Sequence, residues 1–167
     1  NGTTVRYAQL FKCEQVLRSD CNRGVSGIDG STSTAAGAAC VGEGMTVLIT
    51  GDMSFSYDVN GLSSTYLSPR FKIIVMCNGG GGIFRFIKPT SDLPELKTCF
   101  EIHRDISVEK YADLFGLRYF ELNDEKSAAE VLSLFFAEED RPAILAVHTP
   151  NVYNAEVLRG YFRRSRQ

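Results

Sequence analysis

The sequence lacks several features that would assign the chain to a specialised class of protein. None of its apolar runs approaches the roughly 18–20 residues that cross a bilayer, so no membrane span is expected. The first residues are polar, and no secretory signal peptide is expected. The formal net charge is only −2, and without a basic field neither nucleic acid nor an anionic membrane is an expected partner.

Two groups of short motifs are also absent. The five cysteines are widely spaced and include no CxxC pair; they are Cys13, Cys21, Cys40, Cys77 and Cys99. This argues against a disulfide framework and a zinc site, and it predicts reduced thiols in a cytoplasmic protein. Each cysteine is expected to be a small buried hydrophobic residue rather than a nucleophile. Neither GxxxxGKS/T nor a GxGxxG between a strand and a helix occurs, which excludes the common phosphate-binding loops.

The apolar runs that are present predict a parallel sheet. Residues 45–50, 71–77 and 142–149 are almost continuously apolar, as in parallel strands covered on both faces. A shorter strand is expected at 117–122 and a weaker one at 14–19. Helical patterns alternate with these strands; they cover residues 4–12, 31–43, 107–115, 127–138 and the segment that begins at 149–150. We therefore predict an α/β fold with a doubly wound, mostly parallel sheet and helices on both faces. We expect residues 1–167 to form one domain, because no linker is long enough to divide them.

Some helix boundaries carry their own signals. Ser127 and Glu130 form a capping-box pattern. Thr149 is a candidate N-cap for the last helix, with Pro150 as its first residue. The arginines near the C-terminus suit a helix C-terminal dipole and a solvated face better than an RNA site. Residues 88–98 contain two prolines and are expected to form a long loop.

Three polar segments follow predicted strands, where open parallel sheets bind ligands. They are residues 22–30, 50–54 and 77–82. Asp52 offers a carboxylate, Asn78 an amide oxygen, and the four glycines that follow offer uncrowded backbone carbonyls. An all-oxygen set with one carboxylate suits Mg²⁺ that is shared with a ligand's phosphates, and Ser54 would meet a phosphate at the helix start. The ordinary alternatives are a helix N-cap for Asp52 and a turn residue for Asn78.

The residues at these strand ends match a known family. Gly51-Asp52 after one strand and Asn78 after the next resemble the thiamine diphosphate-binding motif. The stretches NRGVSGIDGSTSTAAGAA (22–39), ITGDMSFSYDVNGL (49–62) and CNGGGGIF (77–84) resemble one family more closely. That family is the 2-succinyl-5-enolpyruvyl-6-hydroxy-3-cyclohexene-1-carboxylate synthases of menaquinone biosynthesis, and the similarity is to their C-terminal, pyrophosphate-binding domain.

The resemblance implies thiamine diphosphate and Mg²⁺ or Mn²⁺ as cofactors. It implies that the metal is held by Asp52, Asn78 and the backbone carbonyl of Gly80. The cofactor-binding residues that it implies are Ser26, Gly27, Ile28, Gly51, Asp52, Met53, Ser54, Asn78, Gly80 and Ile83. Among them, Ile28 is the expected apolar wedge beneath the thiazolium ring, which imposes the bent shape of the cofactor.

The resemblance also implies a transferase reaction. In it, 2-oxoglutarate is decarboxylated and the resulting carbanion adds to isochorismate. Both substrates carry carboxylates, which guanidinium groups bind well, and Arg6 and Arg23 occupy the matching positions. Ile83, Phe84 and Ile87 resemble the apolar wall at the substrate end. The residues expected to act in catalysis, by positioning the substrate and shaping the cofactor, are Ile28, Arg6, Arg23 and Phe84.

The resemblance makes this chain the third domain of a longer, homodimeric or tetrameric enzyme. Its activating glutamate lies on an N-terminal pyrimidine-binding domain, so this chain alone is expected to be inactive. Three residues depart from the family pattern: Met53 replaces a glycine, Cys77 an asparagine, and Gly2 a small hydroxyl residue. His148 is expected to be structural, and no role is assigned to His103.

Two other functions remain open at this stage. One is a different thiamine diphosphate enzyme, such as a 2-oxoacid decarboxylase or an acetolactate-type synthase, against which Arg6 and Arg23 argue. The other is a non-catalytic, doubly wound binding module, because fold alone does not imply function.

Overall fold

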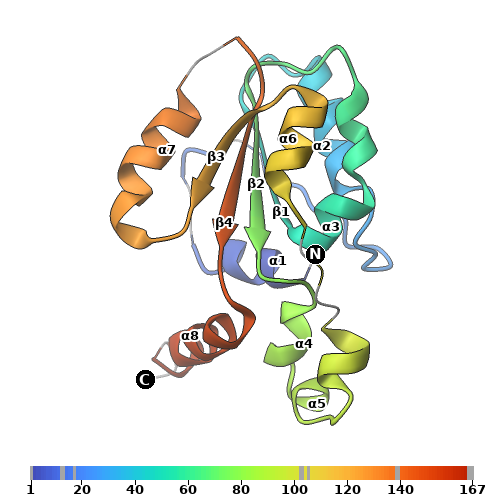
Figure 1. The fold of residues 1–167 in the computed structure, drawn as a ribbon, viewed down its shortest axis with the longest axis vertical. Helices are drawn as coiled ribbons and strands as arrows, with labels where there is room; N and C mark the ends of the chain where they lie inside the picture. Colours follow the sequence, from blue (N-terminus) through green and yellow to red (C-terminus); the bar gives the residue numbers. More distant parts are fainter. Residues whose placement is uncertain are drawn as a thin grey trace.

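The fold is built on a four-stranded, wholly parallel sheet with the strand order β1-β2-β4-β3 (Figure 1). The computed structural model describes residues 2–11, 14–16, 18–101, 104, 106–137 and 140–164. The strands are β1 (Thr46–Gly51), β2 (Phe71–Cys77), β3 (Arg118–Leu122) and β4 (Ala143–His148). Each strand matches its sequence prediction to within a residue at either end, and the predicted α/β class is confirmed. The weak strand expected at 14–19 is absent from the residues described there, which are exposed and lack a neighbouring strand with which to pair.

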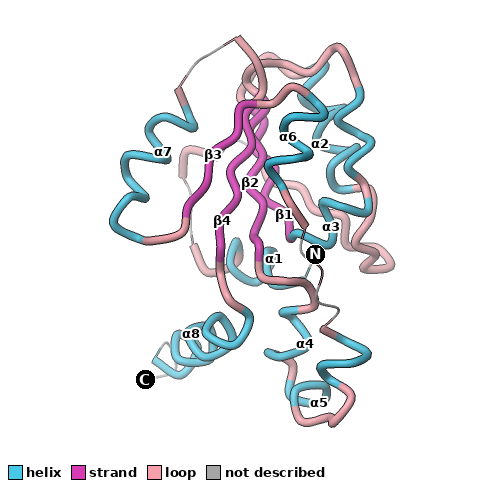
Figure 2. The backbone as a smooth tube through the Cα atoms, viewed as in Figure 1, coloured by secondary structure: helices cyan, strands magenta, loops and turns pink. Residues whose placement is uncertain are grey.

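The helices lie on both sides of the sheet and below it, as the tube drawing shows (Figure 2). They are α1 (Gly2–Ala8), α2 (Ser31–Val41), α3 (Asp52–Tyr57), α4 (Gly82–Phe86), α5 (Lys88–Ser91), α6 (Val108–Phe115), α7 (Ala128–Phe136) and α8 (Asn151–Arg164). Short turns of other helical types are η1 (Val59–Ser63), η2 (Leu96–Phe100) and η3 (Glu125–Ser127). The expected loop at 88–98 is therefore largely helical, because it contains α5 and most of η2.

The capping box predicted at Ser127 is wrong. Ser127 already has near-helical angles at the end of η3, and its hydroxyl donates to the Asp124 carbonyl at 3.2 Å. The side chain of Asp124 caps this turn instead, and accepts from the Lys126 amide at 2.6 Å. The helix predicted at 107–115 does start with a side-chain cap, since the Ser107 hydroxyl accepts from the Lys110 amide.

Helices cover both faces of the sheet, as predicted. On one face, α2, α3 and α6 pack on the sheet; the buried residues there include Ala36, Phe55, Ile73, Ala112 and Ile144. On the other face, Phe135 of α7 packs against Leu145 of β4 and the ring of Phe120 of β3. Figure 1 shows α7 and α6 on opposite sides of the strands. Two-sided burial of this kind explains why β2 and β4 have almost no polar residues.

The sheet has two edge strands, β1 and β3, and β1 is the more apolar of the two. Among the described residues no strand pairs with the outer side of β1. Its side chains alternate: Leu48 is buried, whereas Val47 and Ile49 are 43% and 48% exposed.

The cysteines correct a sequence expectation. Cys21, Cys40 and Cys99 are exposed rather than buried, and Cys77 is partly buried at the end of β2. Cys13 and His103 lie outside the described residues. Among the helices that the structure describes, none combines the length and the apolar character that a bilayer crossing demands.

Candidate functional site

The carboxyl ends of the four strands face α1, α4, α5 and α8 (Figure 1). Asp52 lies among these strand ends, after β1 and beside the end of β2. It is the first residue of α3, directly after β1, and is only 4% exposed. One of its carboxylate oxygens accepts from the Met53 amide at 2.7 Å. The other accepts from the amides of Asn78 and Gly79, at 2.9 and 2.7 Å. Gly51, not Asp52, occupies the N-cap position, so the carboxylate joins the ends of β1 and β2.

The glycine segment after β2 has a backbone that only glycine adopts readily. Gly79, Gly80 and Gly81 have φ angles of 82°, 87° and 67°, in the left-handed region that other residues rarely enter. The side-chain oxygen of Asn78 accepts from the Gly80 amide at 3.0 Å. The run is thus a tightly bonded turn around Asp52 and Asn78.

The loop at 22–30 meets the same edge through Ile28. The Ser54 hydroxyl donates to the Ile28 carbonyl, which joins this loop to α3. The Ile28 side chain is 37% exposed, and Ser26 has a positive φ of 59°. The three polar segments that the sequence placed after strands therefore come together. The Ser54 hydroxyl, expected at a phosphate, has the Ile28 carbonyl as its acceptor here.

The expected substrate wall lies on α4 and just after it. Ile83, Phe84 and Ile87 are each half-buried. The Phe84 ring lies 5.2 Å from the ring of Phe100. Gly2 of α1 faces Ile83, whose Cβ lies 4.0 Å from the point where a Gly2 side chain would begin. The departure at Gly2 therefore falls beside the apolar wall.

The two candidate substrate arginines border this edge but are exposed. Arg6 lies in α1, which packs against β1 and α4. Arg23 lies in the loop at 22–30. Both side chains thus come from segments that contact the elements around Asp52.

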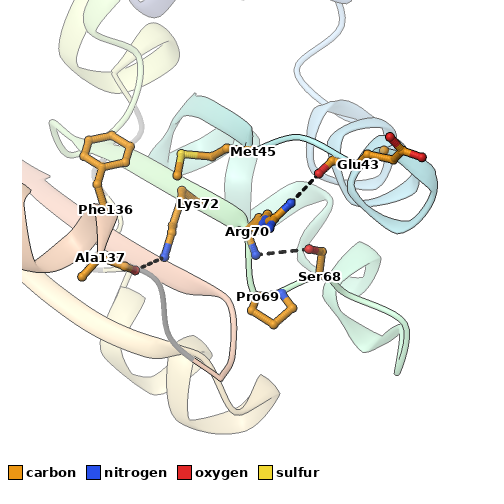
Figure 3. Close-up of a pocket in the computed structure, with 9 residues that line it drawn as sticks. Glu43, Met45, Ser68, Pro69, Arg70, Lys72, Phe136 and Ala137 are labelled. Atoms are coloured by element: carbon orange, nitrogen blue, oxygen red, sulfur yellow. Dashed lines mark hydrogen bonds between the residues drawn. The ribbon is translucent and has the colours of Figure 1, made fainter.

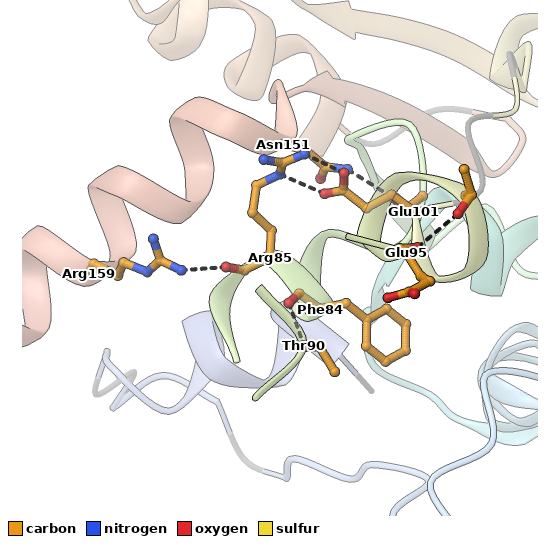
Figure 4. Close-up of polar contacts among 9 residues, drawn as sticks. Phe84, Arg85, Thr90, Glu95, Glu101, Asn151 and Arg159 are labelled. Atoms are coloured by element: carbon orange, nitrogen blue, oxygen red, sulfur yellow. Dashed lines mark hydrogen bonds and ion pairs between the residues drawn. The ribbon is translucent and has the colours of Figure 1, made fainter. Parts of the chain in front are cut away.

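Sequence reasoning missed a second set of residues at this edge, drawn in Figure 4. Asn151, the first residue of α8, is 6% exposed and donates to the Gly80 carbonyl at 2.8 Å. Glu101 is buried and accepts from Arg85 of α4, whose own carbonyl accepts from Arg159 of α8 at 2.5 Å. For Asn151 a signal existed, because it follows a predicted strand just as Asn78 does.

A third group of polar residues lies at the ends of β2, β3 and β4. His148 contacts Glu121 at 2.9 Å, and both are nearly half exposed. Burial, with smaller contributions from Asp52 and Glu121, raises the pKa of the Cys77 thiol to about 12. Burial followed by Glu121 also raises the pKa of Tyr119. His148 thus has a protein partner, as expected of a structural histidine.

A cavity of about 390 Å³ lies at the opposite, amino ends of the strands. Its two basic residues already contact carbonyl groups: Lys72 donates to Ala137 at 3.1 Å, and Arg70 to Glu43 at 2.7 Å (Figure 3). Within the described part of the chain, no three His, Cys, Asp or Glu residues gather as a metal site. A cation at the Asp52 edge would therefore depend on amide, carbonyl and ligand oxygens.

Comparison with known proteins agrees with this geometry. Residues 2–147 match the family described as "Thiamine pyrophosphate enzyme, C-terminal TPP binding domain". A 2-succinyl-5-enolpyruvyl-6-hydroxy-3-cyclohexene-1-carboxylate synthase of Porphyromonas gingivalis is 47% identical over 97% of this chain and 28% of its own length. Proteins of the same name from Flavobacterium johnsoniae and Christiangramia forsetii are 44% and 41% identical, over 29% and 28% of their lengths. This chain thus spans less than a third of these curated relatives. With its match from residue 2 to residue 147, it belongs to the thiamine pyrophosphate enzymes, as a C-terminal TPP-binding domain.

Proposed function

We propose that this chain is the cofactor- and metal-binding domain of a synthase of menaquinone biosynthesis. The synthase decarboxylates 2-oxoglutarate and adds the resulting carbanion to isochorismate. The observation that carries the proposal is the Asp52 carboxylate, bonded to the amides of Asn78 and Gly79 at the meeting point of β1 and β2. The name shared by the relatives supports the choice of this synthase.

The donor set fits a hard divalent cation. Asp52 after β1, and Asn78 and the Gly80 carbonyl after β2, offer three oxygens at the ends of two neighbouring strands, and hydrogen bonds between and within these segments hold them near one another. Only one of the three is charged, and Mg²⁺ or Mn²⁺ in such a set keeps positions for phosphate and water oxygens. The proposed ligands are therefore those that bind a metal together with a diphosphate.

The other residues would bind and position the cofactor. Thiamine diphosphate, when bound, supplies the carbanion-stabilising chemistry. The backbone of residues 51–53 and Ser54 would bind the diphosphate. Ile28, joined to Ser54 through its carbonyl, would support the thiazolium ring, with Ser26 and Gly27 beside it.

The surrounding segments would form the substrate-binding end of the site. Arg6 and Arg23 would bind substrate carboxylates with paired N–H donors, and Ile83, Phe84 and Ile87 would line the apolar side. The rest of the enzyme would supply the pyrimidine-binding domain and its glutamate, in a cytoplasmic homodimer or tetramer. In this scheme residues 1–167 are the last of three domains and are inactive alone.

The test compares two aspartates of the full-length protein by titration with thiamine diphosphate, with and without Mg²⁺. Asp52→Asn removes the only negative charge among the proposed metal ligands. Asp58→Asn, the matched control, alters an aspartate at the end of the same short helix, which bonds Ser33 instead. We expect Mg²⁺-dependent binding to be lost in Asp52→Asn and kept in Asp58→Asn. Cofactor binding by Asp52→Asn at wild-type strength would contradict the proposal.

A second assay separates the proposed reaction from its relatives. The full-length enzyme is expected to release CO₂ from 2-oxoglutarate and to form product only when isochorismate is present. Turnover of pyruvate instead would favour a decarboxylase or an acetolactate-type synthase. Absence of thiamine diphosphate binding by the wild-type protein would favour a non-catalytic module.

A further inference from the structure

Asn151 contacts the glycine segment that carries two of the proposed metal ligands. We propose that it is a positioning residue, which fixes the direction of the Gly80 carbonyl and the orientation of the Asn78 amide. The inference rests on the proposed function, because both groups are proposed metal ligands. Asn151 itself would not contact the metal.

The first observation is the hydrogen bond to Gly80. The Asn151 side-chain nitrogen donates to the Gly80 carbonyl at 2.8 Å, in a buried contact between residues 71 positions apart. Gly80 has a φ of 87° and no side chain, so local packing does little to fix the direction of its carbonyl. The hydrogen bond from α8 selects one direction. A carbonyl oxygen has two lone pairs, and one remains for a cation.

The second observation is the other end of the same amide. The Asn151 side-chain oxygen is buried and has no hydrogen-bond partner among the described residues. It lies 2.4 Å from the point where a Gly82 Cβ would be, and the Asn78 side-chain nitrogen lies 2.8 Å from that point. The two amides therefore face one space, which exists only because residue 82 is glycine. An unpaired buried oxygen is costly. The Asn78 side-chain amide lies beside it and has N–H groups that could donate to it.

The third observation is that contacts with neighbouring elements hold Asn151 and its helix in place. β4, which precedes it, is joined to the end of β2 by a hydrogen bond from the Thr149 amide to the Cys77 carbonyl at 2.9 Å. Further along α8, Arg159 donates to the Arg85 carbonyl, and the Phe162 ring lies 5.9 Å from that of Phe86. The helix that carries Asn151 is thus held against α4, which continues the glycine segment. Ligands supported in this way lose about 10–100-fold in metal affinity when the supporting residue is removed.

The experiment measures Mn²⁺ binding to the full-length protein at saturating thiamine diphosphate, from the spectroscopic signal of free Mn²⁺. Asn151→Ala removes the proposed support. Asn154→Ala is the matched control, because Asn154 lies in the same helix and makes an equally short bond, to the Thr149 carbonyl. We expect the Mn²⁺ dissociation constant to rise about 10–100-fold in Asn151→Ala and to stay unchanged in Asn154→Ala. The melting temperature without metal, measured in parallel, reports any purely structural effect.

Gly82→Ala provides a second variant that keeps Asn151 but displaces its amide. Its added methyl group would meet both amides, so it is expected to weaken Mn²⁺ binding as well. In the Asn151→Ala background, Gly82→Ala is expected to weaken Mn²⁺ binding less, because the Asn151 side-chain oxygen that the added methyl group would meet is absent.

The outcomes separate the two proposals. A wild-type protein without metal-dependent cofactor binding would overturn the proposed function and this inference together. The inference alone would be overturned if the wild-type protein binds thiamine diphosphate and Mn²⁺, and the Mn²⁺ dissociation constant is unchanged in Asn151→Ala. An equal rise in Asn154→Ala would also overturn it, because the effect would then belong to α8 as a whole.

Discussion

Arg85 and Glu101 form a two-pronged ion pair in which the carboxylate is completely buried. The guanidinium group donates to both oxygens of Glu101, through Nε at 2.7 Å and through a terminal nitrogen. Side-chain exposure is 20% for Arg85 and 0% for Glu101. Because burial of two charges costs nearly as much as their attraction returns, the pair contributes little net stability. Its effect is to set the orientation of α4, which carries Ile83 and Phe84, against η2.

We predict that Arg85→Met destabilises the full-length protein by about 3–5 kcal/mol, because it leaves the Glu101 carboxylate buried without a partner. The double variant Arg85→Met with Glu101→Leu is expected to recover most of this loss. Denaturant unfolding measures both. As a control, Arg18→Met disrupts the exposed pair with Asp20, and because solvent screens that pair, stability is expected to change little. A double variant no more stable than Arg85→Met would contradict the explanation.

Gly81 and Gly37 are predicted to respond in opposite ways to alanine. A Cβ on Gly81 would lie 2.3 Å from the Phe100 carbonyl oxygen and 2.8 Å from the Glu101 Cα, at a φ of 67°. Backbone atoms cannot move aside easily, so Gly81→Ala is expected to lower the melting temperature and to disturb α4.

Gly37 is the matched control for this prediction. It lies inside α2 with nothing within 4 Å of its missing Cβ. There alanine is expected to stabilise by about 0.5–1 kcal/mol, because it loses less conformational freedom on folding. Thermal unfolding compares the two variants, and a tolerated Gly81→Ala would show that the close approach is not rigid.

Cys77 gives the protein a predicted sensitivity to alkali. Burial raises the pKa of its thiol from 9.0 to about 12, so the folded protein binds the proton more tightly than the unfolded chain does. The resulting stabilisation is complete below pH 9 and is lost as the pH rises from 9 towards 12. Urea unfolding at intervals over this range is expected to show a smaller decline in Cys77→Ala than in the wild type. Parallel curves for the two proteins would refute the assignment to Cys77.

The sheet and the core of the site were predictable because each depends on local pattern. Near-continuous apolar runs identified β2 and β4, since strands buried on both faces need no polar residues. Asp52 and Asn78 were placed together because neighbouring parallel strands end at one edge, and the hydrogen bond between the Asp52 carboxylate and the Asn78 amide confirms their proximity.

Asn151 and Glu101 were not predictable by the same route. The position of Asn151 beside Gly80 depends on the pairing of β4 with β2, two strands that are not consecutive in the chain. Glu101 lies outside every helix and strand that the sequence predicts, and only its tertiary contact with Arg85 shows why it is buried. Both residues act through contacts that join distant parts of the chain, and the sequence pattern does not encode which distant parts meet.

The open edge at β1 has a consequence for the behaviour of the chain in solution. The strand sequence TVLITG contains no charged residue and no proline, which are the usual means by which sheet edges resist pairing with other molecules. With Val47 and Ile49 exposed beside it, we expect this edge to promote aggregation when the chain is produced by itself. Val47→Lys adds the charge that β1 lacks and is expected to reduce this aggregation, which light scattering of the two proteins at high concentration would measure.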